Sequence, residues 1–413
     1  MNWQAAAIRD ASRAGDYGRV IELTRKNARM TQGQLGEVCG LSQSAVSRLE
    51  KRGTSAYSTD ILAAASAHLG IPSALVGLAA SRPQGEVNGD DVDRRKFLGG
   101  VAATAAAPAL AALPDTADAT GGRAAALRLS TTAYRRLDGS TPSRDLTGAV
   151  HSHMHLIRTI TRSAAGDAER LHLAAVGSEA ASLAGWLAWD MGDHGSARSW
   201  YGSAIKGART AGDPLLTAYQ TGSLAQFEAD AGNAVQALNL TRSARRALGE
   251  RRPSVADAWL SSVEALAHSA AGDRRAADRA LTASRSAAEA LPEEPPPWPW
   301  VFTFDPSKVA AFRVTCGARL GLPEWVLGDD VEALATGHAK QRALLVLDIA
   351  AGHLAGGRVD VAFALAGRAL DIGLKYRSGR IVERARAVRR SLTTATPPKA
   401  VRDFDERLHG VYL

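Results

Sequence analysis

Three histidines at alternate positions, His151, His153 and His155, have the spacing that most directly suggests metal chemistry. On a helix, His151 and His155 lie four residues apart on one face, a separation that zinc ligands use. No carboxylate or cysteine pattern near them completes a set of ligands. We therefore expect a polar helix surface at this position and no metal site.

Catalytic motifs do not appear in a convincing context. The sequence has no nucleophile elbow, Walker loop, dinucleotide-binding glycine pattern or paired carboxylates of the expected kind. Its two cysteines, Cys39 and Cys316, cannot form a disulfide framework and fit a reducing cytoplasm. No stretch has the roughly 18 strongly apolar residues of a membrane helix. We expect no enzyme activity, no cofactor, no membrane partner and a cytoplasmic location.

A second group of polar side chains gathers on one short helix. The pattern over 43–51 buries Val46 and Leu49, which lie three positions apart on the same face. The opposite face then carries polar side chains that point away from the core: Gln43, Ser44, Ser47 and Arg48.

Local signals position this helix within an N-terminal domain at 1–80. Thr31 begins Thr-Gln-Gly-Gln, a capping box that starts one helix, and Ser42 caps the next. Gly40 between them supplies the positive φ of a tight turn. Further helices are expected at 16–29, at 59–69 and from Pro72, which gives a five-helix domain.

The sequence of this block resembles the lambda-repressor-like (XRE-type) helix-turn-helix family: Thr31-Gln32-x-x-Leu35-Gly36-x-x-x-Gly40-Leu41-Ser42-Gln43-Ser44-x-Val46-Ser47-Arg48-Leu49-Glu50. The resemblance implies a transcriptional regulator whose recognition helix enters the major groove of a double-stranded DNA operator. It implies base contacts from Gln43, Ser44 and Arg48, because Gln can bond adenine and Arg can bond guanine at two points. The implied DNA-binding set is Thr31, Gln32, Ser42, Gln43, Ser44, Ser47, Arg48, Lys51 and Arg52.

The charge of this domain limits its affinity for DNA. Although the whole chain carries a net charge of +8, residues 16–81 are nearly balanced. Because a single domain of this kind should bind DNA weakly, we expect the protein to act as a homodimer on paired half-sites. The alternative interpretation is that the polar residues form an ordinary solvated face, or that the small domain binds protein.

Helical periodicity fails at 81–122, which we interpret as a linker. Its segment Asp93-Arg94-Arg95-Lys96-Phe97-Leu98 and the following Ala/Gly run resemble a twin-arginine export signal. Such signals normally stand at an N-terminus, whereas this one follows a folded domain. We therefore favour an interdomain segment in which Phe97, Leu98 and Val101 dock on the rest of the chain.

The region at 123–413 is repetitive. Gly192, Gly232 and Gly272 recur every 40 residues, and Gly357 follows about two periods later. Small residues at fixed offsets from these glycines predict closely packed antiparallel helix pairs stacked into an α-solenoid, interrupted at 291–307 by a proline-rich segment. The offsets are filled by Ala197, Ala237, Ala277 and Ala362; by Ala204, Ala244, Ser284 and Ala369; and by Gly185, Ala225, Ala265 and Ala350.

These repeats resemble tetratricopeptide-type helix pairs, although their period is longer and most of the aromatic positions of that repeat are absent. The resemblance implies a concave groove that binds a signalling peptide or a small hydrophobic ligand. The implied groove residues are Glu179, Trp186, Trp189, Tyr219, Gln226 and Trp259. The alternative is that the aromatic residues belong to the core between repeats.

The C-terminal arginines also leave two interpretations open. They could add affinity for DNA or form a solvated helix face: Arg377, Arg380, Arg384, Arg386, Arg389 and Arg390. The sequence as a whole predicts an all-α regulator with a DNA-binding domain, a linker, and a helical-repeat sensor that also dimerises. The competing hypothesis is a helical-repeat scaffold that binds partner proteins and carries the small domain as an accessory.

Overall fold

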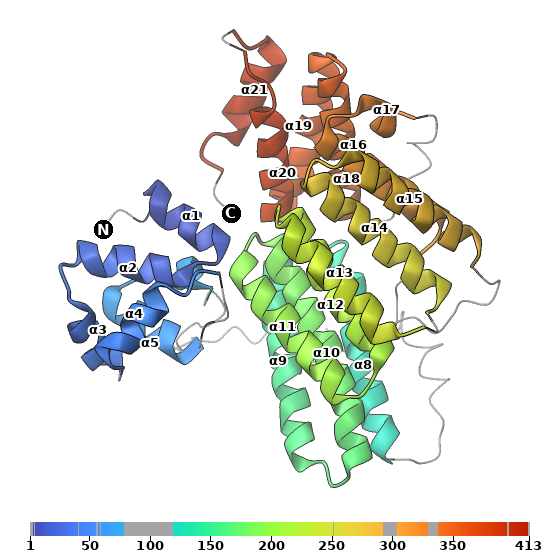
Figure 1. Ribbon diagram of the computed structural model, residues 1–413. Coiled ribbons are helices and arrows are strands. Elements are labelled where there is room, and N and C mark those ends of the chain that lie inside the picture. The colour runs from blue at the N-terminus through green and yellow to red at the C-terminus, as the bar shows by residue number, and fades with distance from the viewer. Residues whose placement is uncertain are drawn as a thin grey trace, which may run out of the picture.

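The computed structural model describes residues 3, 5–39, 41–54, 57, 59–77, 119–250, 252–291, 304–328, 338–394 and 396–411. Every regular element within these ranges is a helix, which confirms the all-α prediction (Figure 1). The twin-arginine segment at 93–98, most of the linker predicted at 81–122 and most of the proline-rich segment at 291–307 lie outside the described residues.

The N-terminal domain packs short helices around one apolar core that includes Val20, Ile21, Leu35 and Val46, all fully buried. Two features differ from the sequence prediction. An additional first helix exists, and the element after Pro72 is one 3-10 turn. The elements are α1 (Ala6–Ala14), α2 (Tyr17–Asn27), α3 (Gln32–Cys39), α4 (Gln43–Glu50), α5 (Thr59–Leu69) and η1 (Ser73–Val76).

The second region consists of antiparallel helices that follow one another along the chain (Figure 1). They are α8 (Ala119–Asp138), α9 (Ser143–Ser163), α10 (Asp167–Asp190), α11 (His194–Thr210), α12 (Pro214–Asp230), α13 (Ala234–Leu248), α14 (Ser254–Ala270), α15 (Arg274–Glu289), α16 (Pro306–Leu320), α17 (Pro323–Val326), α18 (Ala339–Ala355), α19 (Val359–Lys375), α20 (Gly379–Arg390) and α21 (Lys399–Leu408).

The glycines of the predicted period stand at the turns within the pairs α10/α11, α12/α13, α14/α15 and α18/α19. Their φ angles lie between 76 and 84°, a conformation that favours glycine: Gly192, Gly232, Gly272 and Gly357. In two of the turns an aspartate follows directly and caps the second helix. The Asp193 carboxylate, for example, accepts a hydrogen bond of 3.0 Å from the Ser196 N–H.

The small residues at the predicted offsets are all buried between the paired helices. At Gly185, a Cβ atom would lie only 3.2 Å from the Tyr201 ring, so the absence of a side chain allows the close approach. At Ser284, the hydroxyl donates a hydrogen bond of 2.6 Å to the Ala258 carbonyl across the pair. The repeat register inferred from the sequence is therefore the packing register of the structure.

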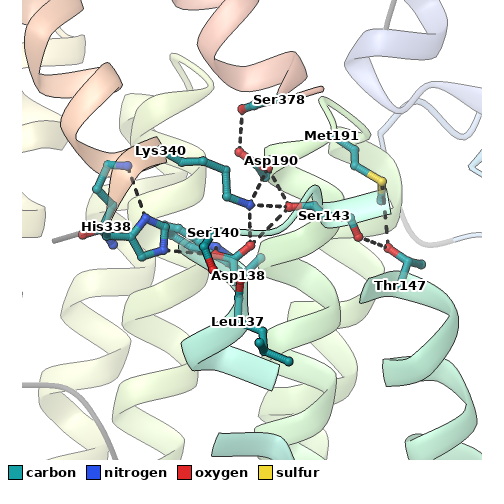
Figure 2. A network of polar contacts seen from close by, with 12 residues as sticks. Leu137, Asp138, Ser140, Ser143, Thr147, Asp190, Met191, His338, Lys340 and Ser378 are labelled. Carbon is teal, nitrogen blue, oxygen red and sulfur yellow. Dashed lines mark hydrogen bonds and ion pairs between the residues drawn. The ribbon is translucent and has the colours of Figure 1, made fainter. Parts of the chain in front are cut away.

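The helical region bends until its C-terminal helices contact its first ones. Figure 2 shows the contact, where Lys340 at the start of α18 reaches between the ends of α8 and α10. Its buried ammonium lies 2.5 Å from Asp138 Oδ1 and 3.1 Å from Asp190 Oδ2, and it donates to Ser143 Oγ at 2.9 Å. The Ser378 hydroxyl, just before α20, donates to Asp190 Oδ1 at 2.6 Å. We call this group the lysine clasp.

A second polar cluster at the C-terminal end of α12 has Asp230 at its centre. The Asp230 carboxylate pairs with Arg319, Arg380 and Arg384 and accepts a hydrogen bond of 3.2 Å from Trp189 Nε1. Burial raises the pKa of Asp230, but the three guanidinium groups outweigh it and hold the pKa well below its usual range. We call this group the Asp230 cluster.

The residues predicted to line a groove lie instead in the core and in these closing contacts. The Arg380 guanidinium sits 3.7 Å from the ring centre of Trp189 and 5.4 Å from that of Trp186, so helix α20 of the same chain covers this surface. Glu179, Trp189, Tyr219 and Trp259 are buried, and Trp186 and Gln226 are partly exposed.

Several arginines of α20 form ion pairs within the chain. Besides the pairs to Asp230, Arg389 binds Asp405 at 2.6 Å and Arg390 binds Glu383 at 2.9 Å. Several arginines of this helix therefore pair with acidic residues of the same chain, while Arg377 and Arg390 are exposed. A contribution of these arginines to DNA affinity stays a prediction.

Candidate DNA-binding interface

Helix α3 begins with the capping box that the sequence predicts. The Gln34 N–H donates to Thr31 Oγ1 at 3.2 Å, and the Thr31 N–H donates back to Gln34 Oε1 at 2.8 Å. These bonds satisfy two backbone donors at the start of α3 and fix the exposed Thr31 at that end.

The turn from α3 to α4 depends on a close approach at Gly36. The Leu41 N–H donates to the Gly36 carbonyl at 2.8 Å, and a Cβ atom on Gly36 would lie 2.4 Å from the Leu41 carbonyl oxygen. Gly40, the glycine predicted to supply the turn, lies outside the described residues. The crossing of the two helices thus requires a glycine at Gly36.

Helix α4 presents the polar face that the sequence predicts. Val46 and Leu49 are buried, whereas Gln43, Ser44 and Arg48 are exposed and Ser47 is partly exposed. Exposed cations follow the helix at Lys51 and Arg52, and the Arg52 guanidinium lies 5.9 Å from the centre of the Tyr57 ring.

Ser42 has a structural role in this face. Its Oγ atom accepts the Ala45 N–H at 3.2 Å, which caps α4, and it lies 3.0 Å from Ser44 Oγ. Ser42 and Ser44 thus bond to each other at the start of the helix. Gln43 and Arg48 have the longest exposed side chains among the predicted contact residues on α4.

A buried ion pair, which no local sequence pattern indicates, orders the N-terminal end of α3. Arg25 on α2 binds Glu50 on α4 through two bonds, of 2.6 and 2.9 Å, and hydrogen bonding to Glu50 raises the pKa of Arg25. Gln32 Nε2 donates to the same carboxylate at 2.7 Å. The Gln32 amide is thereby held in one orientation at the edge of the interface.

The domain docks on α11 of the repeats through α1, the start of α2 and the residue after η1. Tyr17 on α2 donates to Asp193 Oδ1 at 3.1 Å, Ser196 on α11 donates to the Gly77 carbonyl at 2.8 Å, and Arg198 donates to the Ala14 carbonyl at 2.8 Å. Gly195 leaves room for the Tyr17 ring, since a Cβ there would lie 1.7 Å from the tyrosine oxygen.

The three histidines near residue 153 diverge. His153 Nε2 lies 3.0 Å from Thr131 Oγ1 in the core, the His151 ring packs 5.3 Å from that of Trp200, and His155 is exposed. Across the residues that the structure describes, no group of three or more potential ligands could hold a metal ion. Nor is any helix in this part of the chain long and apolar enough to cross a membrane.

Comparison with known proteins supports the assignment of the N-terminal domain. The family model described as Helix-turn-helix matches residues 21–76, which run from within α2 to the end of η1. The searches of curated proteins and of solved structures found no match. The chain therefore carries a helix-turn-helix domain of a class that indicates DNA binding and transcription regulation.

Proposed function

We propose that this protein is a sequence-specific, DNA-binding transcriptional regulator of the cytoplasm that acts as a homodimer and responds to a ligand of its repeat domain. One observation carries the proposal. Gln43, Ser44 and Arg48 are exposed in the described structure while their domain is docked on α11 through Tyr17, Ala14 and Gly77. A helix held in this way can enter a major groove without first leaving the repeats.

The predicted contact residues suit two kinds of contact with DNA, one with base edges and one with phosphates. Gln43 and Arg48 are long enough for two-point contacts with base edges, each worth about 1–3 kcal/mol of discrimination. Thr31, Gln32, Lys51 and Arg52 flank the helix and suit phosphate contacts, which set register and orientation. Two such surfaces related by a two-fold axis would read half-sites about 10 base pairs apart.

Selection of duplexes from a random pool by the purified full chain tests this function. We expect a recovered motif with two related halves at that spacing. The complex with the selected duplex should have the mass of the duplex plus two chains. Recovery of no shared motif would overturn the proposal and favour the scaffold hypothesis. Recovery of a motif with a single half, bound by one chain, would contradict the homodimer but leave the DNA-binding function in place.

A further inference from the structure

A pocket of about 380 Å³ opens between α9, α10 and α11. Its walls include Met154, Ile157, Leu173 and Ala181, which are apolar and otherwise buried. The volume falls within the range of small-molecule sites, and an apolar lining with few polar groups is typical of them.

Two glycines shape the pocket in different ways, since a Cβ atom on Gly207 would lie 3.1 Å from Ser178 Cβ and its absence lets α10 and α11 approach each other. Gly177 on α10 and Gly207 on α11 both line the pocket. A Cβ atom on Gly177 would contact Ile157 Cγ2 at 3.6 Å, so a larger side chain at that position would extend into the pocket wall.

Two guanidinium groups stand beside the apolar walls. Arg158 and Arg162 lie one helical turn apart on α9, line the pocket and are exposed. Within the described part of the chain no ion pair joins either of them to an acidic side chain. Two other arginines of the repeats have such partners, Arg198 in Glu228 and Arg245 in Glu264.

We infer that this pocket binds a small amphipathic carboxylate, with an aliphatic body on the apolar walls and its carboxylate on Arg158 and Arg162. A guanidinium binds a carboxylate through two parallel hydrogen bonds, and the apolar body gains from leaving water. A medium-chain fatty acid has this chemistry. The inference names the ligand class of the regulator proposed above and rests on that function only for its effect on DNA.

Helix α11 connects the pocket to the helix-turn-helix domain. Ser203 and Gly207, in its second half, line the pocket, and Ser196 and Arg198, in its first half, hold the domain. A ligand that moves α11 therefore moves the surface on which the domain is docked.

Calorimetric titration of the full chain with sodium decanoate tests the site directly. We expect saturable binding of one decanoate per chain, and much weaker or no binding of 1-decanol and acetate, which each lack one half of the ligand chemistry. The double variant Arg158→Ala/Arg162→Ala should lose at least tenfold in affinity, and Gly177→Leu should abolish binding. Arg368→Ala, an exposed arginine on α19, is the matched control.

Equal binding of decanoate by the double variant, equal binding of decanol, or no binding at all would overturn the site. Because both arginines are exposed, the double variant stays informative if Gly177→Leu does not fold.

A second titration, with the selected duplex, is expected to show a changed affinity for DNA in the presence of decanoate. An unchanged affinity there would overturn the coupling through α11, and loss of DNA affinity in the double variant without decanoate would assign the arginines to DNA phosphates.

Discussion

The Glu50 carboxylate joins three helices of the helix-turn-helix domain, because it binds Arg25 from α2 and Gln32 from α3 while standing at the end of α4. Both charged side chains are almost fully buried. Removing one partner of such a pair leaves the other charge without compensation in a poorly solvated place.

We therefore expect Arg25→Met to lower the free energy of unfolding by about 3–5 kcal/mol in urea denaturation followed by circular dichroism. The matched control is Arg19→Met, which removes an exposed partner of Glu22 and should cost no more than about 1 kcal/mol. Equal effects of the two variants would show that the buried pair has no special role.

Glu179 gives the repeats a pH dependence at a single residue. Burial raises its pKa to about 7, although the ion pair with Arg128 acts in the opposite direction. Since the folded chain keeps this proton at a pH where the unfolded chain has lost it, stability falls as pH rises from the ordinary glutamate range to about 7.

The variant Glu179→Gln should remove this slope, which amounts to at most about 1.4 kcal/mol per pH unit. In thermal unfolding, the melting temperature of the variant should therefore rise relative to that of the unmodified protein between pH 5 and pH 7. A difference in melting temperature that stays constant over this interval would contradict the assigned pKa.

At the scale of the element, the crossing of α3 and α4 depends on a missing side chain. Gly36→Ala would place a Cβ atom against the Leu41 carbonyl, so we expect a lower melting temperature and reduced DNA binding. Gly33→Ala, in the same helix, meets only Thr31 Oγ1 at 3.8 Å. This control should be neutral or more stable by up to about 1 kcal/mol, because alanine favours a helix. Comparable loss in both variants would refute the steric argument.

The elements that the sequence predicts best are those specified by local contacts. The caps at Thr31 and Ser42 and the glycine turns of the repeats could be predicted because each involves residues a few positions apart. Helix α1 was missed because only Ile8 and Ala11 in it are buried, which leaves too short an apolar pattern to recognise. The DNA-contact residues remain predictions, since their exposure is compatible with that role without requiring it.

The closing of the repeats could not be predicted from local patterns. Lys340 lies about 200 positions from Asp138, and no periodicity relates the two residues. For the same reason local patterns do not show that Arg380 of α20 covers Trp186 and Trp189. The Asp230 cluster shows why that surface is closed, because its three arginines come from α16 and α20.

At the scale of the whole molecule, the position of the helix-turn-helix domain depends on a narrow contact with α11. Gly195→Ala would drive a methyl group into the Tyr17 hydroxyl and should release the domain. We expect a larger radius of gyration in small-angle X-ray scattering, with unchanged helix content. Gly202→Ala on the same helix meets nothing within 4 Å and is the control. An unchanged radius in the first variant would mean that the contact does not hold the domain in solution.

Equilibrium binding of the selected duplex to the double variant Gln43→Ala/Arg48→Ala tests the central claim most directly, with Arg368→Ala as the surface control. Because each two-point base contact is worth about 1–3 kcal/mol, we predict a loss of at least tenfold in affinity for the selected sequence and little change for a scrambled duplex. Affinity equal to that of the unmodified protein for the selected duplex would contradict the assignment of α4 as the helix that reads DNA.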